Sequence, residues 1–149
     1  MEDLKEKKIS FAKALGWAGL VPFTLATIFV LVAPRELISI GYYAGTFYGA
    51  IILSFLGAVH WGLAMADNRK AIWFAWSVLP SLLSFGILMI FEIPLCLFGL
   101  VPVFVLTWFV DLQAAKSGYL PVWYMNLRHM LTIGAIIALC TIALIWLIS

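Results

Sequence analysis

The side chains with the clearest potential for chemistry are ionisable groups inside long apolar stretches. His60 lies in the stretch GYYAGTFYGAIILSFLGAVHWG, at helical spacing with Leu53 and Leu56, on a face that is otherwise apolar. A full charge at the centre of a membrane span costs about 2.5–3.5 kcal/mol, and a neutral histidine avoids that cost. Two interpretations of His60 therefore remain open: an imidazole that hydrogen-bonds to a facing helix, or a group that handles protons or binds a ligand.

Three more polar residues flank the last two apolar stretches. Asp111 ends the fourth stretch, and Arg128 and His129 begin the fifth, so all three are expected near the same membrane boundary as His60. A pair between Asp111 and Arg128 would offset part of the desolvation cost of each charge. In the alternative, each residue is solvated at the interface and only anchors the topology. A carboxylate near a helix C-terminus is unfavourable for the helix dipole, which favours a specific partner for Asp111.

Aromatic side chains gather near the same boundary. Trp61 follows His60, and Trp123 and Tyr124 lie in the segment LQAAKSGYLPVWYMNLRH. Six of the seven tryptophans fall near this end of their stretches and Trp146 near the other, the six being Trp17, Trp61, Trp73, Trp76, Trp108 and Trp123. The tryptophans form either an aromatic belt at head-group depth or an aromatic-lined cavity open to the cytoplasm. The segment that contains Trp123 and Tyr124 is either a turn on the membrane surface or a lid over such a cavity. The candidates for a ligand-binding site or polar network are His60, Trp61, Asp111, Trp123, Tyr124 and Arg128.

Established catalytic and metal-binding motifs are missing from the sequence. It has no G-x-S-x-G, no H-E-x-x-H, no P-loop and no Gly-rich dinucleotide fingerprint. His129 is the only other histidine, and no carboxylate cluster accompanies it or His60, so we predict no metal site and no cofactor. Cys96 and Cys140 lie in different apolar stretches and are interpreted as packing residues. A non-catalytic role is favoured over an enzymatic one.

The composition identifies the solvent in which these residues must be positioned. Of the 149 residues, 65% are hydrophobic and only 11% are charged, which excludes a water-soluble globule because no polar shell can be built. The formal net charge of +2 is too small to indicate nucleic-acid binding. The chain is therefore expected to be an integral membrane protein.

Five apolar stretches are long enough to cross a bilayer as helices, which needs about 20 residues each. The predicted helices cover residues 11–33, 41–65, 71–90, 93–112 and 127–148 in a single membrane domain, 1–149. The runs are continuous where barrel strands would alternate, so the predicted fold is an all-α bundle of five transmembrane helices. Polar turns are expected at Asp67–Lys70 and at Phe91–Glu92. Kinks are expected within spans at Pro22, Pro80 and Pro102.

The positive charges predict an orientation. Eight Lys and Arg residues flank the stretches on one side, namely Lys5, Lys7, Lys8, Lys13, Arg69, Lys70, Lys116 and Arg128, against Arg35 on the other. Because positive loops stay in the cytoplasm, we expect the N-terminus inside and the C-terminus outside.

A row of small residues marks the second predicted helix. Gly41, Gly45 and Gly49 repeat at four-residue spacing and share one face, which allows close approach of another helix. Packing within the chain is favoured over dimerisation, and the small residues predict that this helix lies at the centre of the bundle.

Several blocks resemble a known family: LGWAGLVPF, ILSFLGAVHWGLA, WSVLPSLLSF, and Asp111 followed by LPVWYMNLRHMLT. They are similar to the transmembrane protein 69-like family, inner-membrane proteins of unknown function found in bacteria and mitochondria. All six candidate site residues belong to these blocks, whereas Ala58 stands where the family pattern suggests a second glycine. The resemblance implies a small multi-pass inner-membrane protein and brings no established activity. We expect a bacterial inner membrane, because no mitochondrial transit peptide precedes the first span.

Three functions are compatible with these features. The first is a non-catalytic binding, accessory or assembly protein, with a membrane-protein partner or a homo-oligomer, or with a lipid or small hydrophobic ligand held near the cytoplasmic leaflet. The second is a small transporter or proton conduit that uses His60, Asp111 and Arg128. The third is a membrane enzyme that acts on a lipid or isoprenoid. Nucleic acid is not an expected partner.

Overall fold

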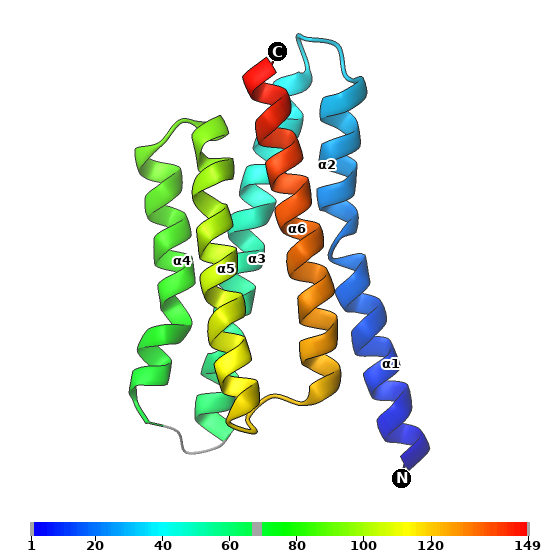
Figure 1. Cartoon of the computed structure of the whole chain (residues 1–149), viewed down its shortest axis with the longest axis vertical. Helices are drawn as coiled ribbons and strands as arrows, with labels where there is room; N and C mark the ends of the chain where they lie inside the picture. Colours follow the sequence, from blue (N-terminus) through cyan, green and yellow to red (C-terminus); the bar gives the residue numbers. More distant parts are fainter. Residues whose placement is uncertain (1, 67–69, 149) are drawn as a thin grey trace.

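The computed structural model describes residues 2–66 and 70–148, which form α-helices and no strand (Figure 1). The helices are α1 (Glu2–Ala18), α2 (Val21–Val32), α3 (Ile38–Ala66), α4 (Ile72–Ile90), α5 (Ile93–Lys116) and α6 (Val122–Ile148). The predicted all-α membrane fold is confirmed, since five segments of this described part are long and apolar enough to span a bilayer. Of the predicted turn at Asp67–Lys70, residues 67–69 lie outside the described residues.

The first span consists of two helices instead of one. α1 ends at Ala18 and α2 starts at Val21, with Gly19 and Leu20 between them. Pro22 explains the interruption, because it has no N–H to donate to the Ala18 carbonyl and its ring would clash with that carbonyl in a continuous helix. Pro22 therefore lies in the first turn of α2, whereas Pro80 and Pro102 lie inside the helices α4 and α5.

α3 occupies the centre of the bundle, as the small residues predict. It packs against α2, α4, α5 and α6, and it passes behind α5 and α6 in Figure 1. Its glycines are used inside the chain: a methyl group at Gly41 would clash with α2, one at Gly45 with α6, and one at Gly49 would press on α5. The closest approach is to α4, where a methyl group at Gly57 would lie 2.2 Å from the Ser77 carbonyl oxygen.

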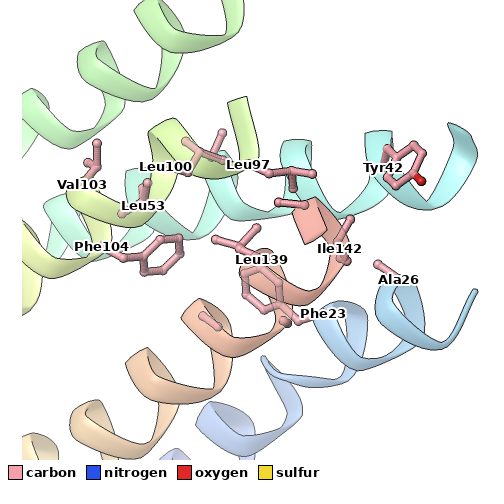
Figure 2. Close-up of a cluster of buried hydrophobic side chains, with 14 of the residues drawn as sticks. Phe23, Ala26, Tyr42, Leu53, Leu97, Leu100, Val103, Phe104, Leu139 and Ile142 are labelled. Atoms are coloured by element: carbon pink, nitrogen blue, oxygen red, sulfur yellow. The ribbon is translucent and has the colours of Figure 1, made fainter. Parts of the chain in front are cut away.

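The apolar core fills the half of the bundle that is nearer the C-terminus. Side chains from α2, α3, α5 and α6 meet there, as Figure 2 shows. Its fully buried members include Leu53, Leu97, Leu100, Leu139 and Ile142. This half is therefore closed mainly by aliphatic packing, and the buried charged side chains of Asp111 and Arg128 lie in the other half.

The end of the bundle with the N-terminus also carries the last turn of α3, the first turn of α4 and the α5–α6 connection, and the C-terminus lies at the opposite end (Figure 1). α6 starts at Val122, directly after Pro121, and not at Leu127 as the sequence suggested. The α5–α6 connection is thereby reduced to residues 117–121, in which Gly118 takes a left-handed φ of 79°. Trp123 and Tyr124 consequently belong to a helix and not to a surface segment, and Arg128 lies in the second turn of that helix.

Candidate functional site

Asp111 is the centre of a buried polar network that joins three helices. Its Oδ1 lies 2.7 Å from Nε2 of His60 on α3, and its Oδ2 accepts a hydrogen bond of 2.6 Å from Nε of Arg128 on α6. The three side chains are between 1% and 3% exposed. The three ionisable residues that the sequence distributes over three spans therefore converge at one point.

The network lies in the half of the bundle that carries the N-terminus. His60, Asp111 and Arg128 are each five or six residues from the end of their helix. At a rise of 1.5 Å per residue, this places them about 8–9 Å inside the helix ends. The site thus lies inside these apolar helices and close to one end of the bundle.

Two threonines complete the contacts of the Arg128 guanidinium. Nη1 donates to Oγ1 of Thr132, and Nη2 donates to Oγ1 of Thr107 at 3.1 Å. Thr107 precedes Asp111 by four residues and Thr132 follows Arg128 by four, so each shares a helix face with its charged neighbour. Neither threonine is among the residues predicted for the site, although the four-residue spacing from a charged residue marks both.

His60 is held on both its edge and its face. An ionised carboxylate only accepts hydrogen bonds, so His60 Nε2 donates to Asp111. The Trp73 indole stacks on the imidazole, with ring centroids 5.2 Å apart and ring planes 14° apart. Nδ1 of His60 is buried and has no hydrogen-bond partner among the residues that the structure describes. The imidazole is therefore fixed in place with one polar atom unused.

Tyr124 lies beside the same network. Its hydroxyl is close enough to Arg128 and Asp111 to interact with both charges. This hydroxyl is buried and has no hydrogen-bond partner within the described part of the chain. The Trp123 ring packs edge-on against the Tyr124 ring, with centroids 6.2 Å apart. A buried hydroxyl without a partner is costly, so a molecule that supplies one is favoured at this position.

An apolar groove leads from the membrane-facing surface to Arg128. Two adjoining cavities, of about 250 and 340 Å³, share a lining of Leu15, Gly16, Phe55, Leu56, Arg128 and Leu131. Trp123 and Tyr124 line the second cavity as well. Leu15 on α1 and Phe55 on α3 are more than half exposed and form the rim. We call this feature the α1–α3–α6 groove.

The remaining polar and aromatic candidates lie elsewhere. Trp61 is 44% exposed and packs edge-on against Phe74. His129 accepts a hydrogen bond of 2.7 Å at Nδ1 from Nε1 of Trp108. Because an indole only donates, His129 carries its proton on Nε2. Within residues 2–66 and 70–148, no group of three or more His, Cys, Asp or Glu side chains is arranged to hold a metal ion.

The fold and this site define a class: a multi-pass helical membrane protein with a buried His–Asp–Arg network near one membrane boundary. Residues 9–144 match the family described as "Protein of unknown function (DUF3429)", and the chain belongs to that family. It is also 32% identical over 129 residues to transmembrane protein 69 of Xenopus tropicalis. That match covers 84% of this chain and 50% of the relative, so the chain spans about half the length of the curated relative it matches. No solved structure matches.

The family resemblance deduced from the sequence blocks is thereby confirmed. The matched region contains all six candidate site residues and begins before the α1–α3–α6 groove. The relative's name describes a transmembrane protein and states no activity. The function of this chain must therefore be inferred from its own site.

Proposed function

We propose that this chain is a non-catalytic binding protein of the bacterial inner membrane, which holds a lipid or other small hydrophobic molecule and serves a membrane complex as an accessory protein. The observation that carries the proposal is the α1–α3–α6 groove, which ends at the buried Arg128 and the half-buried Tyr124. Residues 1–149 act as one membrane domain in this proposal.

The walls of the groove favour an occupant that arrives through the membrane. Leu15, Phe55 and Leu131 are apolar and line both cavities, so a water molecule in this space finds few hydrogen-bond partners. A membrane-soluble molecule replaces lipid tails along these walls at little cost. Pockets of a few hundred Å³ with few polar groups are typical of small-ligand sites.

The polar end of the groove gives such an occupant a fixed position. The Tyr124 hydroxyl is buried with no hydrogen-bond partner among the described residues, and Arg128 lines both cavities. A ligand atom that hydrogen-bonds to these groups satisfies donors that lipid tails leave unpaired. An amphipathic molecule fits both ends of the groove.

The two alternative functions have less support. A proton conduit needs polar groups across the whole membrane, whereas the other half of the bundle is closed by fully buried Leu97, Leu139 and Ile142. An enzyme that used His60 as a base needs its substrate at the imidazole, yet His60 is not among the residues that line the groove. A binding function needs only the apolar walls of the groove and the polar groups at its end.

The accessory role rests on a narrower basis. The glycines at 41, 45 and 49 contact helices of the same chain, so they leave no small-residue face that requires a second protein. The proposal of a partner therefore depends on the small size of the chain and on the non-catalytic character of its site. Recovery of a larger complex together with the chain is the result that supports this role.

The orientation is part of the proposal. α6 contains Arg128 and buries it, so this residue no longer counts as a loop charge. The other seven positive residues of the N-terminal side remain, against Arg35 in the opposite connection. This excess supports a cytoplasmic N-terminus, an external C-terminus and a groove near the cytoplasmic leaflet.

Native mass spectrometry of the protein released gently from its own membranes tests the proposal. We expect a small apolar molecule on the wild type, its loss in Leu15→Trp, which fills the rim of the groove, and its retention in Leu25→Trp. Leu25 is a matched control because it is equally exposed on α2 and does not line the groove. A wild type without any bound molecule, or equal retention by both variants, would contradict the proposal.

A further inference from the structure

We propose that the α1–α3–α6 groove selects a neutral lipid whose head carries a carbonyl oxygen, and that it rejects anionic lipids of the same shape. This inference rests on the proposed binding function and specifies the chemistry of the ligand. It follows from the hydrogen-bond donors and the charges at the end of the groove.

The polar end of the groove offers donors. A guanidinium has five N–H groups, and three of those of Arg128 are directed at Asp111, Thr107 and Thr132. Two N–H groups lie beyond these bonds, and Arg128 is close enough to direct one of them at the Tyr124 oxygen. The buried Tyr124 hydroxyl adds an O–H for which the described residues supply no acceptor. The complementary ligand atom is therefore an acceptor, either a carbonyl oxygen or an anionic oxygen.

The charges decide between these two acceptors. The Asp111 carboxylate lies 2.6 Å from the Arg128 Nε and already neutralises the guanidinium. An anionic head at Arg128 would add a second negative charge beside the Asp111 carboxylate, and both side chains are at most 3% exposed. Like charges in such surroundings repel strongly, because the effective dielectric constant is low. A carbonyl oxygen accepts the same hydrogen bonds and leaves the charge balance unchanged.

The groove also fits the apolar remainder of such a molecule. Leu15, Phe55 and Leu131 offer an aliphatic and aromatic surface that continues to the exposed rim. Trp123 lines the second cavity next to Tyr124 and offers a flat face to a ring or an ester group. Isoprenoid quinones carry carbonyl oxygens on a neutral ring, and diacylglycerols carry ester carbonyls next to a neutral hydroxyl head, each with long apolar chains.

The test uses purified full-length protein in nanodiscs that contain one probe lipid at low mole fraction. The probes are a diacylglycerol, a phosphatidate with identical acyl chains, and a short-chain isoprenoid quinone. The first two differ only in the phosphate, so their comparison isolates the charge of the head. We expect native mass spectrometry to find at least one neutral probe retained about tenfold more than phosphatidate, and the better of the two neutral probes identifies the source of the carbonyl.

Two variants locate the effect. Tyr124→Phe removes the hydroxyl and keeps the ring, so we expect about fivefold weaker retention of the neutral probe, as for the loss of one hydrogen bond. Leu15→Trp should remove all probes. The unfolding temperature of each variant shows whether the bundle is intact, and Leu131→Trp serves as a second groove-filling variant if Leu15→Trp does not fold.

The outcomes separate the two proposals. Retention of phosphatidate equal to or above that of both neutral probes, with loss in Leu15→Trp, would overturn the head-group inference and leave the binding function standing. Retention of every probe by folded Leu15→Trp and Leu131→Trp would overturn the binding function itself. Unchanged retention of the neutral probe by Tyr124→Phe would overturn the role of the hydroxyl and with it the donor argument.

Discussion

Arg128 donates its Nε hydrogen to Oδ2 of Asp111 at 2.6 Å, across the interface of α5 and α6, and neither residue is more than 3% exposed. The same carboxylate contacts His60 through its other oxygen, so one side chain ties α5 to both α3 and α6. Because both charges are shielded from water and lipid by the bundle, each depends on the other for its stability.

Asp111→Asn should destabilise the fold strongly. The substitution keeps the shape of the side chain but leaves the Arg128 charge buried without a counterion, which costs about 3–5 kcal/mol in comparable sites. Thermal unfolding in detergent measures the effect. Asp3→Asn is the control, because Asp3 forms an exposed ion pair with Lys7 and its loss should change the unfolding temperature little.

A second substitution separates the charge from the packing. Asp111→Asn combined with Arg128→Met removes the uncompensated charge, so the double variant should unfold at a higher temperature than Asp111→Asn alone. A double variant that is less stable than Asp111→Asn would show that Arg128 contributes mainly through other contacts.

Thr132→Val and Thr107→Val should each weaken the bundle by about 1 kcal/mol. Valine keeps the volume of threonine but does not accept the hydrogen bond from Nη1 or Nη2 of Arg128. Because both threonines act through one guanidinium, the effects should not add, and a double-mutant cycle by equilibrium unfolding measures the coupling. Strict additivity would contradict a shared network. Thr141→Val is a suitable control, since Thr141 is only half-buried and its hydroxyl donates to the Ile137 carbonyl of its own helix.

Gly57→Ala should separate α3 from α4. The added methyl group would lie 2.2 Å from the Ser77 carbonyl oxygen, so the helices must move apart at a cost of about 1–3 kcal/mol. Gly62→Ala, on the same helix, has open space around its Cβ position and should be neutral or slightly stabilising. Unfolding of both variants under identical conditions checks the difference, and equal stability would show that the close contact is readily relaxed.

Reporter fusions should place the two termini on opposite sides of the membrane. Alkaline phosphatase fused after the C-terminus should be active and green fluorescent protein at the same position dark, because the positive residues favour a cytoplasmic N-terminus. The opposite pattern would invert the orientation and move the groove to the outer leaflet. A charge-shifted variant with added Lys residues beside Arg35 is expected to weaken the preference.

Much of this architecture could be predicted from hydropathy. Continuous apolar runs fix the number of spans because a membrane allows only helices that satisfy their own backbone, and the glycines of α3 indicate its central position. The boundaries were less predictable. Pro22 separates α1 from α2 by removing one backbone donor, although the apolar run 11–33 suggested one continuous helix. α6 starts directly after Pro121, although the polar residues before Leu127 suggested a later start.

The candidate site was predictable only in its residue types. His60, Asp111 and Arg128 stand out because ionisable groups are expensive in a span, yet the sequence left open whether they meet. The positive charges that predict the orientation included Arg128 as a residue flanking a span, whereas the structure buries its side chain inside α6. Thr107 and Thr132 escaped notice because threonine is common in apolar helices, and only their spacing from Asp111 and Arg128 marks them.

The sequence by itself determined the membrane class, the spans and the family, because these depend on composition, on local runs of residues and on blocks that are contiguous in the chain. Only the tertiary structure decided that three polar residues from α3, α5 and α6 share one point, and that an apolar groove leads to one of them, Arg128. The physical reason is that the rotation and crossing angle of each helix are set by packing between distant segments, such as Gly57 against Ser77. The hydropathy of a single segment does not contain this information.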